Sequence, residues 1–179
     1  MTRLVLCRHA AAGNTVEARD LAVALGGVPF AAVYTSPLER AVETARAVAM
    51  THGLVPVEVA DLREIEFGDV EGLEFSRYPP ELQTELLKEP LSVRFPGGET
   101  YGELRMRVCR ALDDVVKRHS DESVLIVTHA GSIRAALAAW LGITGEAIFR
   151  IDQRTASVNV VDWVEGTPIV RLLNGTHPG

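Results

Sequence analysis

The stretch that decides the fold is Leu4-Val5-Leu6-Cys7-Arg8-His9-Ala10, in which an apolar run of four ends in a cation and an imidazole. Such a run is typical of a buried strand that leads to the carboxyl edge of a sheet. Ligands bind at that edge in open parallel sheets, which makes Arg8 and His9 candidate site residues. A single histidine at a strand end can also be a polar residue that leaves the core, so this stretch alone leaves both interpretations open.

The same design occurs again in Val124-Leu125-Ile126-Val127-Thr128-His129-Ala130-Gly131. A second apolar run ends in a histidine, His129, and small residues and a helical pattern follow it. Small residues let a ligand approach the backbone closely. Two strand-end histidines in one small domain therefore predict a single site that is built from both.

Between and after these two stretches, helical and strand-like patterns alternate along the chain. Apolar spacing predicts helices over 16–25, from Pro37 to Ala49, from Tyr101 to about His119 and over 133–141. Strands are predicted over 31–35, 55–59, 124–128, 157–164 and 168–173. We therefore expect an α/β three-layer sandwich, with a mainly parallel sheet, an antiparallel edge strand and helices on both faces.

Local signals mark where three of these elements begin or end. Ser36 can cap the second helix, with Glu39 completing a capping box, and Thr100 and Glu103 form another such box. Glu165-Gly166 separates the last two strands in the manner of a tight hairpin turn.

The 179 residues are expected to form a single domain, 1–179, with a cover segment at about 74–98. That segment holds four prolines and only weak helical signals, around 80–88. We expect it to lie over the edge of the sheet.

Charge and composition narrow the possible partners and the location. A net charge of −6 disfavours nucleic acid and anionic membranes as partners. No apolar run approaches the roughly 18 residues that a membrane span needs, and no signal peptide is visible. Cys7 and Cys109 lack metal-ligand spacing and fit the reducing cytoplasm. The sequence does not indicate an oligomeric state.

Five polar residues from four parts of the chain form a candidate constellation, namely Arg8, His9, Arg40, Glu64 and His129. Arginine presents a planar fork of donors that suits phosphate oxygens, and a neutral imidazole is a nucleophile. A carboxyl group can protonate a leaving oxygen. These are the parts of a metal-free phosphoryl-transfer site, in which the two arginines would repel a metal cation.

Alternatives remain open for two members of the constellation when each is considered alone. Arg40 could be a solvated helix residue, and Glu66 and Asp69 are competing carboxylates in the same loop as Glu64. Arg107 lacks the context of the constellation and is predicted to be solvated.

The motifs resemble those of the histidine phosphatase superfamily, the phosphoglycerate mutase-like proteins. The matching stretches are Arg8-His9-Ala10, residues 35–45, residues 62–72, Pro96-Gly97-Gly98-Glu99 and residues 127–134. Their order and spacing cover nearly the whole chain. By this resemblance His9 is the phosphorylated nucleophile, and Arg8, Arg40 and His129 hold the phosphoryl oxygens. Glu64 is the general acid and then the general base, and no cofactor is implied.

The sequence departs from the family pattern after the nucleophile. Ala10 replaces the usual glycine, and the loop before the first helix is short, with Asn14 displaced by one position. This places in question any phosphate contact from Asn14 or Thr15.

We expect a metal-independent cytoplasmic phosphatase that hydrolyses small-molecule phosphomonoesters through a phosphohistidine on His9. The stretch 62–72 followed by Pro96-Gly97-Gly98-Glu99 looks similar to alpha-ribazole phosphatases and to broad-specificity members. The alternatives are a phosphoglycerate mutase, a phosphohistidine protein phosphatase and an inactive binding domain. The chain ends soon after its last strand, which favours water as the acceptor, and Glu64 argues against a phosphoramidate substrate.

Overall fold

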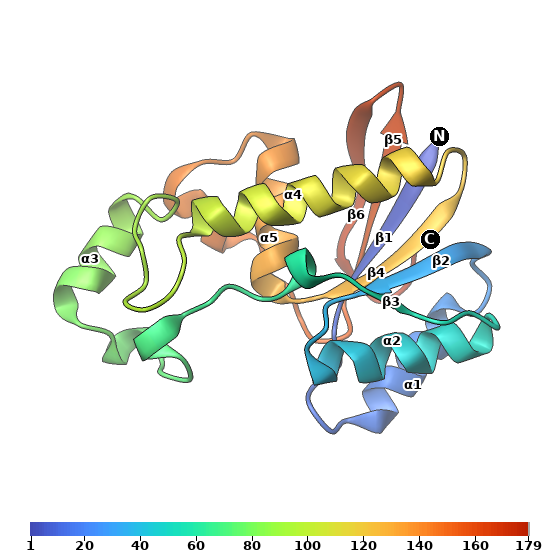
Figure 1. Cartoon of the computed structure of the whole chain (residues 1–179), viewed down its shortest axis with the longest axis horizontal. Helices are drawn as coiled ribbons and strands as arrows, with labels where there is room; N and C mark the ends of the chain where they lie inside the picture. The colour runs from blue at the N-terminus through green and yellow to red at the C-terminus, as the bar shows by residue number, and fades with distance from the viewer. Residues whose placement is uncertain (179) are drawn as a thin grey trace.

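The computed structural model describes residues 1–178 and contains a six-stranded sheet with the strand order β3-β2-β4-β1-β5-β6 (Figure 1). The strands are β1 (Thr2–Arg8), β2 (Phe30–Thr35), β3 (Val57–Glu58), β4 (Ser123–Thr128), β5 (Val158–Val164) and β6 (Thr167–Gly175). Strand β4 is parallel to its neighbours β1 and β2, and β3 is parallel to β2. Strand β5 is antiparallel to β1, and β6 is antiparallel to β5. The expected mainly parallel sheet with antiparallel pairing at one edge is confirmed.

Helices cover both faces of this sheet, as expected. The α-helices are α1 (Thr15–Leu25), α2 (Glu39–Thr51), α3 (Pro80–Lys88), α4 (Tyr101–Arg118) and α5 (Ala130–Leu141). Buried residues of α1 and α2, such as Leu21 and Ala45, pack in one core with Val5. Buried residues of α4 and α5, such as Leu112 and Leu137, pack in a second core with side chains from the opposite face of the sheet.

Strand β1 is apolar throughout its middle because it is covered on both faces. Val5 and Cys7 belong to the core beside α1 and α2, whereas Leu4 and Leu6 belong to the core beside α4 and α5. A strand that is buried on both faces is continuously apolar rather than alternating. Polar residues can therefore follow only where the strand leaves the two cores, which is at Arg8 and His9.

Two of the local signals, the Thr100 box and the Glu165-Gly166 turn, act as the sequence predicts. Thr100 and Glu103 form both hydrogen bonds of a capping box at the start of α4. Glu165 and Gly166 have φ of 51° and 81°, as the tightest hairpin turns require at both central positions. Gly142 ends α5 in the left-handed conformation.

Two expectations near the site are wrong. Ser36 does not cap α2: its N-cap is Leu38, which makes no side-chain cap bond, and Ser36 takes part in the site instead. The strand expected over 55–59 is reduced to the two residues of β3, whose Val57 is half exposed. An edge strand with so little buried surface has little to stabilise a longer ladder.

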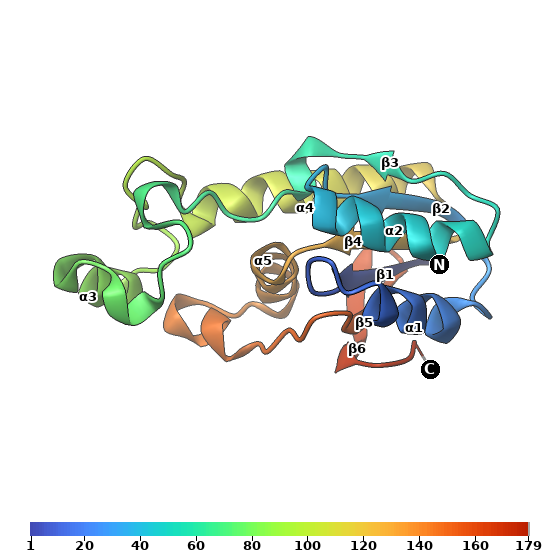
Figure 2. The ribbon, with the colours of Figure 1, turned by 90° about the horizontal axis from the view of Figure 1, so that it is seen from below.

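The segment 74–98 projects from the sandwich beyond the first turn of α4, and α3 lies at its far end in both views (Figures 1 and 2). It contains α3 and a short 3₁₀ turn, Phe75–Arg77. We call it the cover lobe. Within residues 1–178, no helix is both long and apolar enough to cross a membrane.

Candidate active site

The two strand-end histidines lie side by side because β1 and β4 are neighbouring parallel strands. Arg8 pairs with Thr128 at the end of the ladder, and the His9 amide donates to the Thr128 carbonyl at 2.9 Å. The imidazole rings have centroids 5.0 Å apart, and both rings are buried. The fold therefore brings together the two histidines that the sequence predicts to share a site.

Two hydrogen bonds hold the His9 ring so that one of its nitrogens presents a lone pair. Its Nδ1 lies 2.6 Å from the Ala10 carbonyl oxygen, which can only accept, so the proton is on Nδ1. Its Nε2 accepts a hydrogen bond from Nε of Arg40 at 3.1 Å. Burial, together with the charges of Arg40 and Arg8, holds the pKa of His9 below its usual value. The ring is therefore neutral at pH 7, and its Nε2 is a potential nucleophile beside a cation.

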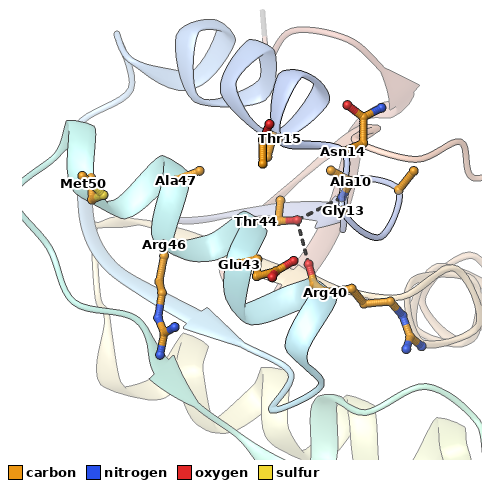
Figure 3. Close-up of a pocket in the computed structure, with 12 residues that line it drawn as sticks. Ala10, Gly13, Asn14, Thr15, Arg40, Glu43, Thr44, Arg46, Ala47 and Met50 are labelled. Carbon is orange, nitrogen blue, oxygen red and sulfur yellow. Dashed lines mark hydrogen bonds between the residues drawn. The ribbon is translucent and has the colours of Figure 1, made fainter.

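Thr44 of α2 joins the backbone beside His9 to the backbone of Arg40 (Figure 3). Its buried hydroxyl accepts from the Ala10 amide at 3.0 Å and donates to the Arg40 carbonyl at 2.8 Å. Ala10 thus bonds to α2 through its amide nitrogen and orients the His9 ring through its own carbonyl oxygen. This links the position of the candidate nucleophile to the helix that carries Arg40.

Arg8 is oriented by a buried pair of amides that sequence reasoning missed. Its Nη1 donates to the Gln153 carbonyl at 2.6 Å. The side chains of Gln153 and Asn159 exchange two hydrogen bonds, at 2.8 and 2.9 Å, and Asn159 also donates to the Leu6 carbonyl. Both amide side chains are almost fully buried. The pair therefore locks the carbonyl that holds Arg8 to the middle of β1.

His129 is fixed by Ser36, the residue that was expected to cap α2. Its Nε2 lies 2.7 Å from the Ser36 hydroxyl, which also accepts from the Leu38 amide. Burial, then the neighbouring His9 and Arg40, lower the pKa of His129 to about 2. The ring is therefore neutral, and when the Ser36 hydroxyl donates to Nε2, Nδ1 carries the proton.

Two buried side-chain atoms within residues 1–178 have no hydrogen-bond partner, and both belong to this site. They are Nε of Arg8 and Nδ1 of His129. Buried polar groups are almost always paired, so two unpaired nitrogens in one place indicate a ligand that accepts hydrogen bonds. With Arg40 beside them, an anion with several oxygens fits this arrangement best.

Glu64 lies against the first turn of α5. Its two carboxylate oxygens accept from the Ile65 amide at 2.9 Å and the Gly131 amide at 3.1 Å. A Cβ at position 131 would overlap Oε1 of Glu64, so a side chain there would displace the carboxylate from this position. Gly131 follows His129 by two residues, so this contact places the Glu64 carboxylate at the carboxyl edge of the sheet.

Arg107 is not solvated, contrary to the sequence prediction, and its side chain is only 12% exposed. Its guanidinium pairs with Glu99 and donates to three carbonyls of the acidic loop, those of Asp61, Arg63 and Glu64. This single side chain therefore shapes the loop that carries Glu64. In the sequence, only the spacing of one helical turn between Glu103 and Arg107 indicates a structural role for Arg107. That spacing is common on exposed helix faces, so it does not identify a buried arginine.

The structure thus brings His9 into contact with His129 and Arg40, places Arg8 next to His9 at the end of β1, and places Glu64 against the start of α5. The displaced Asn14 caps α1 through the Glu17 amide and is occupied there. Within residues 1–178, no group of three or more histidine, cysteine or acidic residues could hold a metal ion. What the cluster can do chemically is bind a phosphoryl group and attack it from His9.

Comparison with known proteins gives a consistent result. The model of the family described as "Histidine phosphatase superfamily (branch 1)" matches residues 13–176. The bifunctional protein Rv2228c of Mycobacterium tuberculosis is 34% identical over 155 residues, which are 84% of this chain but 42% of that protein. The chain therefore spans less than half the length of this relative.

A second curated relative is phosphoserine phosphatase 1 of Hydrogenobacter thermophilus, 29% identical over 89% of this chain and 77% of that protein. Among solved structures, Bacillus stearothermophilus YhfR superposes with a TM-score of 0.88 at 27% identity, over 98% of each chain. The alpha-ribazole phosphatase of Shigella flexneri superposes with a TM-score of 0.79 at 25% identity, over 99% of this chain and 98% of the other.

Proposed function

Since the chain belongs to branch 1 of the histidine phosphatase superfamily, we propose that it hydrolyses small-molecule phosphomonoesters through a phosphoryl group carried on His9. The observation that carries this proposal is the state of His9. Its Nδ1 proton is committed to the Ala10 carbonyl, and its Nε2 lone pair faces the guanidinium of Arg40. Substrate oxygens that replace this contact would bring the phosphorus to Nε2.

In the first step, Nε2 of His9 attacks phosphorus while the bond from phosphorus to the ester oxygen breaks. Arg8, Arg40 and Nδ1–H of His129 donate to the phosphoryl oxygens, whose charge they balance. Glu64, in its protonated form, gives its proton to the departing oxygen. The products are an alcohol, a phosphorylated His9 and a Glu64 carboxylate.

In the second step, the Glu64 carboxylate takes a proton from water, whose oxygen attacks phosphorus. The bond from phosphorus to Nε2 breaks, and its electron pair returns to the ring. Inorganic phosphate leaves, and both His9 and Glu64 recover their starting protonation states. The exchange of roles at Glu64 follows from microscopic reversibility.

We also propose a cytoplasmic location and a substrate that is neither nucleic acid nor membrane lipid. The two cysteines are free, and the net charge of −6 repels polyanions. Transfer to a second phosphoglycerate in place of water, as in a mutase, is the competing reaction of the same site.

The test is labelling with a ³²P-phosphomonoester, with the reaction quenched in alkaline detergent so that a phosphohistidine survives. We expect a covalent label that is labile in acid and stable in alkali, as a phosphohistidine is, and that is absent in His9→Ala. Inorganic phosphate should be released at the rate of turnover. A label on another residue, or turnover without a label under conditions where the first step is fast, would contradict the proposal.

A further inference from the structure

A second pocket lies on the cover-lobe side of the site, and no step proposed so far uses it. It has a volume of about 360 Å³, within the range of small-molecule sites. All the side chains that line it are apolar or aromatic, and two of them carry a hydroxyl. They are Phe67, Phe75, Tyr78, Leu86, Leu87, Phe95, Tyr101 and Phe149.

The floor of this pocket is ordered and its rim is open. Tyr78, Phe95 and Tyr101 are buried, and Phe95 packs edge-on against Tyr78 and at a tilt against Tyr101, with ring centroids 6.2 and 6.1 Å away. Phe75 and Phe149, by contrast, are 42% and 37% exposed. A pocket with a rigid aromatic floor and an exposed apolar rim is shaped to receive an apolar group rather than to be filled by its own side chains.

The walls of the pocket are tied to the loop that carries Glu64. The Glu99 amide donates to the Glu66 carbonyl, and the Asp69 amide donates to the Pro96 carbonyl. Arg107 holds Glu64 and Glu99 together. The pocket therefore keeps a constant position relative to the candidate acid.

Tyr101 stands between the pocket and Glu64. Its ring contacts Phe95 and Phe149 in the pocket, with centroids 6.1 and 5.4 Å away. Burial, together with the nearby charge of Glu64, raises the pKa of Tyr101 to about 12, so its hydroxyl remains neutral. Arg134 hydrogen-bonds to Tyr101 and donates to the Ile151 carbonyl, so its charge is already engaged.

In an in-line displacement the leaving oxygen lies opposite the attacking nitrogen, on the side of the group that protonates it. Glu64 therefore marks the side of the leaving group, and Tyr101, which lines the aromatic pocket, lies near Glu64. The pocket between α1 and α2 in Figure 3 is lined by Ala10 and Arg40 but by neither Glu64 nor His129, and so does not adjoin the candidate acid.

We propose that the aromatic pocket binds the leaving group, and that the substrates are phosphate monoesters of hydrophobic alcohols or phenols. This inference rests on the proposed phosphatase function. A charged leaving group such as serine would place its ammonium and carboxylate against a wall with no charged side chain, and burial of an unpaired charge is unfavourable. The aromatic wall therefore selects against the amino acid ester.

The test is a series of n-alkyl phosphates, ethyl, butyl and hexyl, whose leaving oxygens are chemically alike. We expect kcat/KM to rise about two- to fourfold per added methylene, as burial of a methylene allows. Phosphoserine should be at least about tenfold worse than hexyl phosphate. A flat series, or a preference for phosphoserine, would overturn the inference.

Two rim variants, Phe75→Ser and Phe149→Ser, should flatten this rise, so that the ratio of kcat/KM for hexyl phosphate to that for ethyl phosphate falls toward one. Both side chains are exposed, so the fold should tolerate the change, which thermal unfolding checks. Leu173→Ser, at a side chain that is 41% exposed and lies outside the pocket, should keep the full rise. A rise that survives in both rim variants would assign the preference to another surface. Absence of hydrolysis of any ester and of any label on His9 would instead refute the proposed function.

Discussion

The carboxyl edge of the sheet and the cover lobe differ in how their side chains are held. At the edge, His9, His129 and Arg8 are each fixed by hydrogen bonds to residues that are distant in the sequence. In the cover lobe, the side-chain hydrogen bonds join neighbours in the chain, as in the bonds of Gln83 to the Ser76 and Tyr78 carbonyls, and the longer-range Asp69–Pro96 backbone bond ties the lobe to the Glu64 loop. The comparison teaches that the side chains proposed to hold the phosphoryl group are fixed by the sandwich, whereas those of the cover lobe are held locally and can be exchanged with less effect on that group.

The largest expected effect is at the edge. His9→Ala removes the group that carries the phosphoryl, so we expect kcat to fall by more than about 10⁴-fold. A change in the cover lobe outside the aromatic pocket, Gln83→Leu, should keep kcat within about twofold. Steady-state assays of both variants make the comparison, and a His9→Ala enzyme that retains a few per cent of activity would remove the distinction between the regions.

Glu64→Gln should distinguish poor leaving groups from good ones. General acid catalysis contributes about 10²–10⁴-fold, and an alkoxide needs the proton far more than a nitrophenolate does. We expect single-turnover phosphorylation of His9 by hexyl phosphate to lose most of this factor, and that by p-nitrophenyl phosphate to lose much less. The single-turnover measurement excludes the role of Glu64 in activating water. Equal losses would assign Glu64 a structural role and make Glu66 the next candidate acid.

His129 should make the stability of the fold dependent on pH. Its pKa is about 2 in the folded chain and about 6.5 when unfolded, so the unfolded state binds a proton as the pH falls below 6.5. The free energy of unfolding should therefore drop by about 2 kcal/mol between pH 7.5 and pH 5 from this residue alone.

Urea unfolding of the wild type and of His129→Gln at the two pH values isolates this contribution. The variant should show a drop that is smaller by that amount. An unchanged pH dependence would mean that His129 is protonated, or exposed, in the folded state.

The lowered pKa of His9 affects stability in the same direction. It should also extend activity to pH values below 6.5, because the nucleophile stays unprotonated there.

The amide pair tests whether long-range positioning matters at the edge. Asn159→Leu frees the Gln153 carbonyl from its anchor on β1, and we expect KM and the inhibition constant of phosphate to rise about tenfold, in line with a hydrogen bond to a charged group. The matched change in the cover lobe, Gln83→Leu, should leave phosphate inhibition unchanged. Asn159→Gln should recover part of the affinity if the hydrogen bonds, rather than bulk, are responsible.

The smallest expected effect is that of chelators. Arg8 and Arg40 supply the positive charge that a metal would otherwise bring, so EDTA should leave activity unchanged. Loss of activity in EDTA, followed by recovery with a divalent ion, would contradict this interpretation of the cluster.

Much of this architecture could be predicted from local patterns. The apolar runs that end in His9 and His129 identify the central strands because only a strand buried on both faces needs such a run. The Thr100 box and the Glu165-Gly166 turn are determined by hydrogen bonds and φ values within a few residues. The family resemblance placed Arg40 beside the nucleophile, where the Arg40–His9 contact now lies.

Other features could not be predicted because their partners are brought together only by the folded sheet. Ser36 has the spacing of a helix cap, yet it pairs with His129, 93 residues away in the sequence. Arg107 has the spacing of an exposed helix residue, yet it holds a loop more than 40 residues earlier in the chain.

By itself, the sequence determined the order of strands and helices, the two strand-end histidines and the residue types of a phosphoryl site, since these depend on periodicity and on short-range chemistry. The tertiary structure alone decided which partner each histidine nitrogen has, which amides orient Arg8, and that the cover lobe encloses an aromatic pocket with Phe67, Tyr101 and Phe149. These properties depend on burial and on hydrogen bonds between distant segments, whose geometry exists only once the sheet is assembled.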